Sequence, residues 1–266
     1  MVLVLERMNE DLFDVMRSWR PLQTTANIMK ELLIGMIELK KHNITHRDLK
    51  PENIFVSKKK KKRVTDDEKQ KGKEKEEEEE EEQYVVKIAD FEAWQQGAVI
   101  DHDILNHCGT PFFRSPEYLL GAPPSSCDTR EDMWGAGWTF SNLLGIAPFD
   151  KLPQHYKPND AIFPKEELGI LFDYMQLPIP TDSKKREEFF VWSTFLTQEI
   201  VQQKFSWISP HKDFRFLDAV TRDLLEGMLQ PNPLFRLSPE QALLHPFFSF
   251  HTEPTPLQNL ISSLLK

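Results

Sequence analysis

The sequence predicts a mainly α-helical protein with a small β-ribbon. Residues 24–42, 132–144 and 217–229 space their apolar side chains at the intervals of buried or amphipathic helices. Residues 54–56 and 85–88 are short apolar runs rich in β-branched side chains, which predicts the two strands of the ribbon. The helical stretches are the longer ones, so the helices are expected to carry the core.

Shorter elements complete the expected order. Residues 2–5 predict a buried strand, and residues 11–20 predict an amphipathic helix that Pro21 ends. Residues 239–245 predict a last helix, whereas residues 151–213 are rich in proline and are expected to be irregular. Trp134 and Trp138, four residues apart on one expected helix, indicate packing rather than a binding site.

Composition narrows the class of protein. The chain has 266 residues, 39% of them hydrophobic and 28% charged, which is typical of a soluble globular protein. A net charge of −9 argues against nucleic acid as a partner. No apolar run approaches the ~18 residues that cross a bilayer, so no membrane contact is expected, and the first residues lack the basic start of a signal peptide. Cys108 and Cys127 form no disulfide framework, which favours an intracellular location, cytoplasmic or nuclear.

Residues 46–53 read H-R-D-L-K-P-E-N, and the rest of the chain is organised around them. Phosphoryl transfer relies on positioning and charge, and this loop offers a carboxylate, an ammonium and an amide at short spacing. Further motifs follow in order: D-F-E at 90–92, C-G-T-P at 108–111, S-P-E at 115–117, D-M-W-G-A-G at 132–137, and Arg236.

These motifs resemble those of the eukaryotic protein kinase family, over residues 1 to about 250. The resemblance implies a protein-kinase-like fold consisting of the C-terminal large lobe and the hinge strand. It divides the chain into a kinase domain, residues 1–250, and a peripheral tail, residues 251–266. It also implies that Arg236 pairs with Glu117.

The resemblance assigns the catalytic roles. Asp48 would be the base that accepts the substrate hydroxyl proton, and Lys50 would neutralise the transferred phosphoryl group. Asn53 and Asp90 would be the ligands of Mg²⁺. Thr110 would bond both Asp48 and Lys50.

The resemblance also assigns the nucleotide contacts. Glu6 and Met8 would bond the adenine of ATP through the hinge backbone, and Phe55 would lie under the ring. Lys50, Asn53 and Asp90 would face the phosphates and their Mg²⁺. The expected cofactors are therefore ATP and Mg²⁺.

The chain differs from the family pattern before the hinge. Its first glycine is Gly35 and its first lysine is Lys30, so no glycine-rich loop and no strand lysine precede residue 6. We expect the small lobe to be mostly missing, either because the gene model starts late or because the protein lacks half of the nucleotide cleft. Glu92 replaces the glycine of D-F-G, which is a second departure.

Residues 58–83 form a low-complexity charged insertion between the two expected strands. The segment holds nine Lys and one Arg against two Asp and nine Glu. Such a segment buries little apolar surface, so it is expected to be disordered or a solvated helix. The basic run 58–63 also fits a nuclear-localisation signal, although a simple low-complexity expansion is the plainer interpretation. The basic and acidic blocks could attract each other and close the loop.

The segment between Phe91 and Thr110 contains no Ser, Thr or Tyr. In the family, an arginine at the position of Arg47 usually accompanies a phosphate that orders this segment. Asp101 and Asp103 are the anions that the segment itself offers, so one of them is expected to contact Arg47 without phosphorylation. The alternative is that both aspartates are simply solvated.

The favoured function is a serine/threonine protein kinase that transfers the ATP γ-phosphate to a protein substrate. Lys50 favours Ser or Thr over Tyr as the acceptor. The R-S-P-E-Y-L-L-G run at 114–121 is similar to cyclin-dependent-kinase-like enzymes, whereas C-G-T-P is similar to other groups. The alternative is an inactive pseudokinase or a truncated fragment that acts as a binding scaffold. A regulatory protein partner, cyclin-like or otherwise, stays open.

Overall fold

The computed structural model describes residues 8, 10–16, 21–61, 81–93, 95–96, 109–122, 129–147, 164–252, 254 and 256–264. The expected strand at 2–5, the hinge residue Glu6, and both cysteines lie outside the described residues. So do Trp19, the centre of the charged insertion, and both Asp101 and Asp103.

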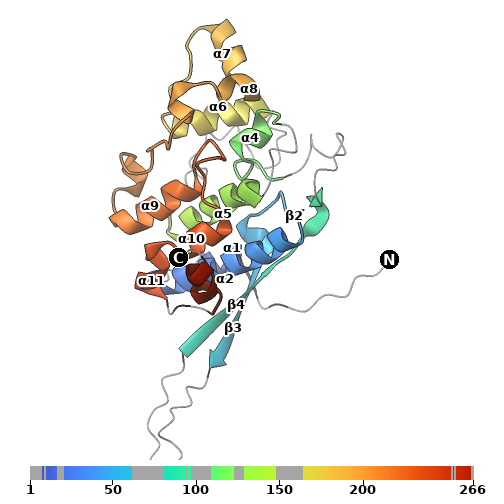
Figure 1. The fold of residues 1–266 in the computed structure, drawn as a ribbon, viewed down its shortest axis with the longest axis vertical. Coiled ribbons are helices and arrows are strands. Elements are labelled where there is room, and N and C mark those ends of the chain that lie inside the picture. The colour runs from blue at the N-terminus through green and yellow to red at the C-terminus, as the bar shows by residue number, and fades with distance from the viewer. Residues whose placement is uncertain are drawn as a thin grey trace, which may run out of the picture.

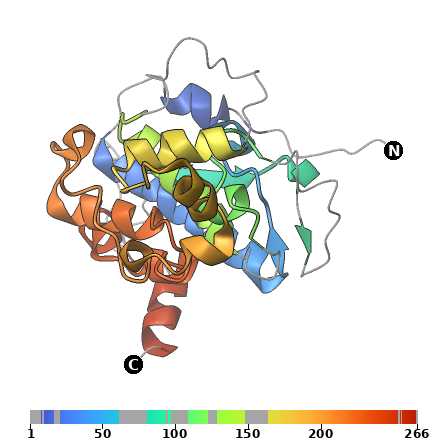
Figure 2. The same cartoon turned by 90° about the horizontal axis from the view of Figure 1, so that it is seen from above.

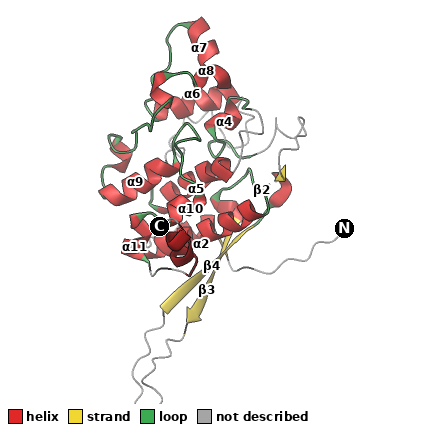
Figure 3. Ribbon diagram, viewed as in Figure 1, coloured by secondary structure: helices red, strands yellow, loops and turns green. Residues whose placement is uncertain are grey.

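Helices form the body of the molecule (Figures 1 and 3). The longest are α2 (Leu22–Lys41) and α5 (Thr129–Leu143), and both match the predicted helices to within three residues. The other α-helices are α1 (Leu12–Met16), α4 (Pro116–Leu119), α6 (Pro164–Tyr174), α7 (Ser183–Phe189), α8 (Trp192–Phe195), α9 (Ala219–Met228), α10 (Pro239–Leu243), α11 (Pro246–His251) and α12 (Pro256–Leu264). Short 3-10 helices lie at η1 (Pro51–Asn53), η3 (Phe91–Ala93), η6 (Glu199–Val201) and η7 (Lys212–Phe214). None of the described helices combines the length and the apolar character that a bilayer crossing needs.

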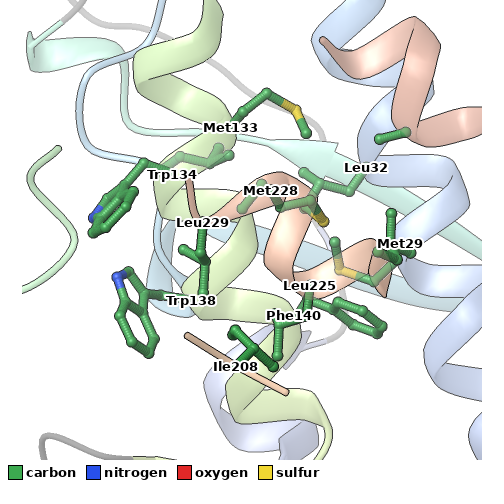
Figure 4. Close-up of a cluster of buried hydrophobic side chains, with 14 of the residues drawn as sticks. Met29, Leu32, Met133, Trp134, Trp138, Phe140, Ile208, Leu225, Met228 and Leu229 are labelled. Atoms are coloured by element: carbon green, nitrogen blue, oxygen red, sulfur yellow. The ribbon is translucent and has the colours of Figure 1, made fainter. Parts of the chain in front are cut away.

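The core is built around α5. Trp134, Trp138 and Phe140 on this helix are fully buried, and residues of α2 and α9 pack around them (Figure 4). Gly135 lets the loop at residues 46–53 lie directly on α5, because a Cβ at this position would collide with the carbonyl oxygen of Leu49. The buried helix is therefore also the floor of that loop.

Two small sheets accompany the helices. Strands β3 (Ile54–Lys61) and β4 (Glu81–Ile88) form an antiparallel hairpin, and β1 (Glu10–Asp11) pairs with the other edge of β3. The hairpin extends away from the helical body (Figure 1). A second, two-stranded sheet joins β2 (Ile44–Thr45) to β5 (Gln95–Gln96).

The hairpin corrects one expectation. The charged insertion was expected to be disordered or helical from residue 58 to residue 83, yet both strands continue into it. The register places Lys58 opposite Tyr84, Lys60 opposite Glu82, and Lys61 opposite Glu81. Backbone pairing therefore extends both strands beyond the predicted bounds.

The region expected to be irregular, residues 151–213, holds α6, α7 and α8 in its described part. Phe172, Phe189 and Phe195 pack their rings together and tie these helices into one cluster. The apolar side chains outweigh the prolines: Pro164 begins α6, and Pro178 and Pro180 follow its end. The C-terminal tail also folds, and its helix α12 stands out from the body (Figure 2) while Gln258 Nε2 bonds the carbonyl oxygen of Leu243 at 2.8 Å.

Candidate active site

The loop at residues 46–53 is held from below by a buried carboxylate. The backbone N–H groups of His46 and Arg47 each donate to Asp132 of α5, both at 2.8 Å. Arg47 has a φ of 69°, a left-handed conformation that these two bonds stabilise. Burial raises the pKa of Asp132, while His46 and the two N–H groups oppose this by favouring the ionised form. The loop is therefore held on the buried helix α5.

A second anchor joins the loop to the end of β4. His46 Nε2 lies 2.8 Å from the carbonyl oxygen of Ala89, and its ring contacts Phe91 edge-on at 4.8 Å. The N–H of Ala89 donates to the carbonyl oxygen of Asn53 at 2.9 Å. These bonds bring Asp90, the next residue, to the side of the loop that carries Asn53.

Four of the predicted catalytic side chains meet at one point. Thr110 Oγ1 donates to Asp48 Oδ1 at 2.7 Å and accepts from Lys50 Nζ at 2.6 Å. Lys50 Nζ also lies 3.2 Å from Asp48 Oδ2. Asn53 Nδ2 donates to the same oxygen at 3.0 Å and to the Asp48 carbonyl oxygen at 2.8 Å. Asp48 is therefore an oriented carboxylate beside one positive charge.

Asn53 and Asp90 fit the part of magnesium ligands by their chemistry. The nitrogen of the Asn53 amide is used by Asp48, so the amide oxygen is the atom left for a cation. Asp90 is exposed and has a φ of 62°. One carboxylate and one amide oxygen suit Mg²⁺, which usually keeps several waters and phosphate oxygens. Among the described residues no group of three or more His, Cys, Asp or Glu side chains could hold a metal by itself.

The residues expected to contact adenine lie along β3. Phe55 is half-buried and pairs with Asp11 of β1. Met8 is half-buried as well, with its Sδ 3.8 Å from the hydroxyl of Ser57. The structure thus places Met8 beside the strand of Phe55, whereas Glu6 is outside the described residues.

Glu92 fits the turn after Asp90 without a left-handed φ. It is exposed and lies within η3 (Phe91–Ala93), and the positive φ of this turn belongs to Asp90. The backbone at Glu92 is therefore one that a residue with a side chain adopts without strain.

A turn at residues 110–113 forms the wall next to Thr110. Phe113 N donates to the Thr110 carbonyl oxygen at 3.1 Å, which closes the turn. Buried Glu167 of α6 accepts the N–H of Phe112 at 2.5 Å, and its other oxygen lies 3.2 Å from Arg114 Nη1. Burial raises the pKa of Glu167 to about 7, and the positive charge of Arg114 opposes that shift.

Arg47 has an anionic neighbour that the sequence analysis overlooked. Its Nε lies 3.7 Å from Glu131 Oε1 of α5, and both side chains are buried. The guanidinium also lies 5.6 Å from the ring centroid of Tyr118. Asp101 and Asp103 were therefore not the only anions to consider. Glu131 directly precedes Asp132.

The predicted pair of Arg236 with Glu117 is confirmed. Arg236 Nη1 and Nη2 bond the two carboxylate oxygens at 2.6 and 2.8 Å. The guanidinium lies 5.0 Å from the ring centroid of Trp134. Such a bidentate buried pair fixes the orientation of both side chains, and it ties α4 to the segment before α10.

The comparisons with known proteins agree with this geometry. The family model described as the protein kinase domain matches residues 1–248, so the chain belongs to the protein kinase family. Its mostly helical fold with a small sheet is that of a kinase domain.

Among its relatives are cyclin-dependent kinases, which support a kinase of that kind. Cyclin-dependent kinase B2-1 of Arabidopsis thaliana is 28% identical over 276 residues, covering 96% of this chain and 70% of that protein. Cyclin-dependent kinase 15 of Danio rerio is 27% identical over 241 residues, covering 87% of this chain and 46% of that protein. The chain thus spans less than half the length of the second relative.

Sequence reasoning missed the carboxylates that support the site from behind. Asp132 was noted only as part of a helix motif, and Glu131 and Glu167 were not considered. Each of these three carboxylates is more than fifty positions along the chain from the group that it contacts. The signal available was a carboxylate within an otherwise apolar helical face, which indicates a buried and therefore paired charge.

Proposed function

We propose that the chain is the catalytic part of a serine/threonine protein kinase. The observation that carries the proposal is the meeting of Asp48, Lys50, Asn53 and Thr110 at hydrogen-bonding distance. The family and the cyclin-dependent relatives support the Ser/Thr type. The carboxylate is oriented by two neutral donors and stays accessible to a hydroxyl.

In the proposed reaction, the oxygen of a substrate Ser or Thr attacks the γ-phosphorus of ATP. The bond from that phosphorus to the bridging oxygen of ADP breaks, and Asp48 accepts the hydroxyl proton. Lys50, 3.2 Å from Asp48, balances charge on the transferred group. Magnesium held by Asn53 and Asp90 would neutralise the phosphates when bound. The turn at 110–113 would receive the substrate residue after the acceptor.

Replacement of Asp48 tests the proposal. In an active form of the protein, Asp48→Asn should lower turnover by ~10²–10⁴-fold, since a positioned proton acceptor contributes that much. Asp90→Asn should remove most activity as well, through the metal. The measurement is transfer of labelled phosphate to an array of serine-containing peptides. Near-normal turnover in Asp48→Asn would refute the assignment of the base.

Glu52 is the matched control for this test. It lies in the same loop, is exposed, and has no assigned chemistry. Glu52→Gln should leave turnover within about twofold, because exposed substitutions rarely disturb the fold. A loss equal to that of Asp48→Asn would mean that the loop as a whole is sensitive.

The alternative function, a scaffold without catalysis, is favoured by two departures from the family pattern, one of which is Glu92 in place of the glycine of D-F-G. Residues 1–266 contain no glycine-rich loop and no lysine before residue 30, so they supply one side of a nucleotide site. We propose that activity requires a glycine-rich loop and a strand lysine, which these residues do not hold, and that a protein regulatory partner, as the names of the relatives imply for them, acts on this chain. An intracellular location completes the proposal.

A further inference from the structure

The turn at residues 110–113 has a backbone that its sequence does not favour. Pro111 stands at the second position, where a positive φ is impossible, and Phe112 stands at the third with a φ of 69°. With the bond from Phe113 N to the Thr110 carbonyl oxygen at 3.1 Å, this is a type II turn. Glycine is usual at the third position of such a turn. Phe112 is therefore held in a strained conformation by its surroundings.

The strained turn is held by Glu167 of α6. One oxygen of its carboxylate accepts the N–H of Phe112 at 2.5 Å, and the side chain is 0% exposed. The other oxygen lies 3.2 Å from Arg114 Nη1, and Arg114 Nη2 donates to the Gly109 carbonyl oxygen at 2.9 Å. The Glu167 carboxylate thus fixes the turn directly through Phe112. It also fixes Gly109, the residue before the turn, through the guanidinium of Arg114.

Thr110 lies between Gly109 and Phe112, the two residues that Glu167 holds. Its hydroxyl bonds Asp48 at 2.7 Å and Lys50 at 2.6 Å. Gly109 is packed against the other side of the catalytic loop, because a Cβ there would lie 2.9 Å from the Arg47 carbonyl oxygen. A shift of the turn would therefore move the Thr110 hydroxyl away from the expected base.

We infer that Glu167 is a positioning residue for the substrate side of the active site. This role rests on the proposed function. Through Glu167, helix α6 fixes the position of the turn at residues 110–113, which would lie beside the substrate Ser or Thr, and thereby maintains the hydrogen bond between Thr110 and Asp48. Glu167 touches neither reacting group. It acts through Phe112, Arg114 and Gly109.

Hydrogen exchange of residues 109–114 in the full chain tests the inference without requiring activity. Glu167→Gln keeps the size of the side chain but removes the charge and turns an N–H₂ group toward Arg114 or Phe112. At pH 8, above the pKa of about 7 of Glu167, exchange of these amides should accelerate by about tenfold, the effect expected from losing a charge-assisted hydrogen bond. The matched control is Glu166→Gln, an exposed neighbour in the same helical turn, which should leave the segment unchanged.

Two outcomes would overturn the inference. One is exchange in Glu167→Gln that equals the Glu166→Gln control. The other is equal acceleration throughout α5 and α9, which would make Glu167 a general support of the fold. The double variant Phe112→Gly, Glu167→Gln covers the case in which the single variant does not fold. Glycine accepts the positive φ, so the double variant should fold and lose less protection relative to Phe112→Gly alone. A double variant that also fails to fold counts against the inference.

A kinetic measurement separates this inference from the proposed function. In an active form of the protein, Glu167→Gln should raise the KM for a serine peptide from the array about tenfold while the KM for ATP stays within about twofold. An equal rise in both constants counts against the inference. If no form of the protein, including one supplied with a glycine-rich loop and a strand lysine, transfers phosphate to a peptide in the array, the proposed function fails, and hydrogen exchange still decides whether Glu167 holds the turn.

Discussion

At the scale of the residue, this molecule places buried carboxylates behind its reactive groups. Asp132 holds the backbone before Asp48, Glu131 lies beside Arg47, and Glu167 holds the turn after Thr110. Each is compensated by N–H groups or a guanidinium, as burial of a charge requires. Asp48 and Lys50, which would contact the substrate, are more exposed, and these buried carboxylates fix the backbone on which they lie.

The pair of Arg236 and Glu117 should be worth far more than a surface pair. Its side chains are 0% and 1% exposed, so Glu117→Gln leaves a buried cation without its anion. Removing one partner of such a pair typically costs ~3–5 kcal/mol in free energy of unfolding. Urea unfolding would measure it. The control is Lys40→Met, which breaks the partly exposed pair with Glu240 and should cost ~1 kcal/mol or less. Equal costs would contradict the prediction.

Glu167 should make stability depend on pH. Its pKa is raised from 4.5 to about 7 by burial, and Arg114 is the charged group that opposes this. The native state therefore binds a proton that the unfolded state has lost between these values. The stability contributed by the protonated form is complete below pH 4.5 and is lost as pH rises through 7.

Unfolding at pH 5.5 and at pH 8 would measure this dependence. Between these two pH values, the free energy of unfolding should fall by on the order of 2 kcal/mol more in the unaltered protein than in Glu167→Gln. The estimate takes about 1.5 pH units from pH 5.5 to the pKa of about 7, at 1.36 kcal/mol per unit. Glu166→Gln should behave like the unaltered protein. The same pH dependence in all three proteins would mean that Glu167 keeps an ordinary pKa.

The residues in the loop at 46–53 could be predicted from sequence because all of them lie within eight positions, so the spacing itself carries the chemistry. Thr110 and Asp90 were found through short motifs with the same property. Glu167 could not be predicted, because its partners Phe112 and Arg114 lie more than fifty positions away. Only the packing of α6 against α4 brings them together.

At the scale of the element, helix boundaries were predicted best where the periodic pattern of apolar residues continued over a long stretch. The helices α2 and α5 came out close to expectation, whereas α6 to α8 were missed because prolines obscured shorter apolar runs. The hairpin was underestimated. From composition alone, a run of lysines and a run of glutamates are expected to be solvated. In the structure, residues 58–61 on β3 pair with residues 81–84 on β4.

The observed hairpin defines which part of the insertion is dispensable. Replacing residues 62–80 with Asn-Gly would join Lys61 to Glu81, which are already paired, through a two-residue turn. The melting temperature should stay within a few degrees, because the ladder from residue 54 to 61 is kept. Removing residues 58–83 instead should cost ~1 kcal/mol, since it also deletes the contact of Lys58 with the Tyr84 ring. A large loss in the shorter deletion would show that the removed segment packs on the lobe.

At the scale of the whole molecule, the helical lobe has its own core and presents its reactive groups on one side. Buried residues of α2, α5 and α9 pack on one another, and the loop at 46–53 rests on α5 at Gly135. The residues expected to be catalytic are thus held in place by contacts among the described residues.

Binding of Mg-ATP to residues 1–266 should therefore be weak, about millimolar or weaker, which corresponds to roughly 4 kcal/mol. Small-molecule sites usually bury ~70–90% of the ligand surface. Phe55, Asn53 and Asp90 would reach the nucleotide from one side under the proposed function, and these 266 residues hold no glycine-rich loop to cover the phosphates. Titration calorimetry with Asp90→Asn as control would decide the matter. Micromolar binding that Asp90→Asn abolishes would overturn the prediction, because this lobe would then form a complete nucleotide site by itself.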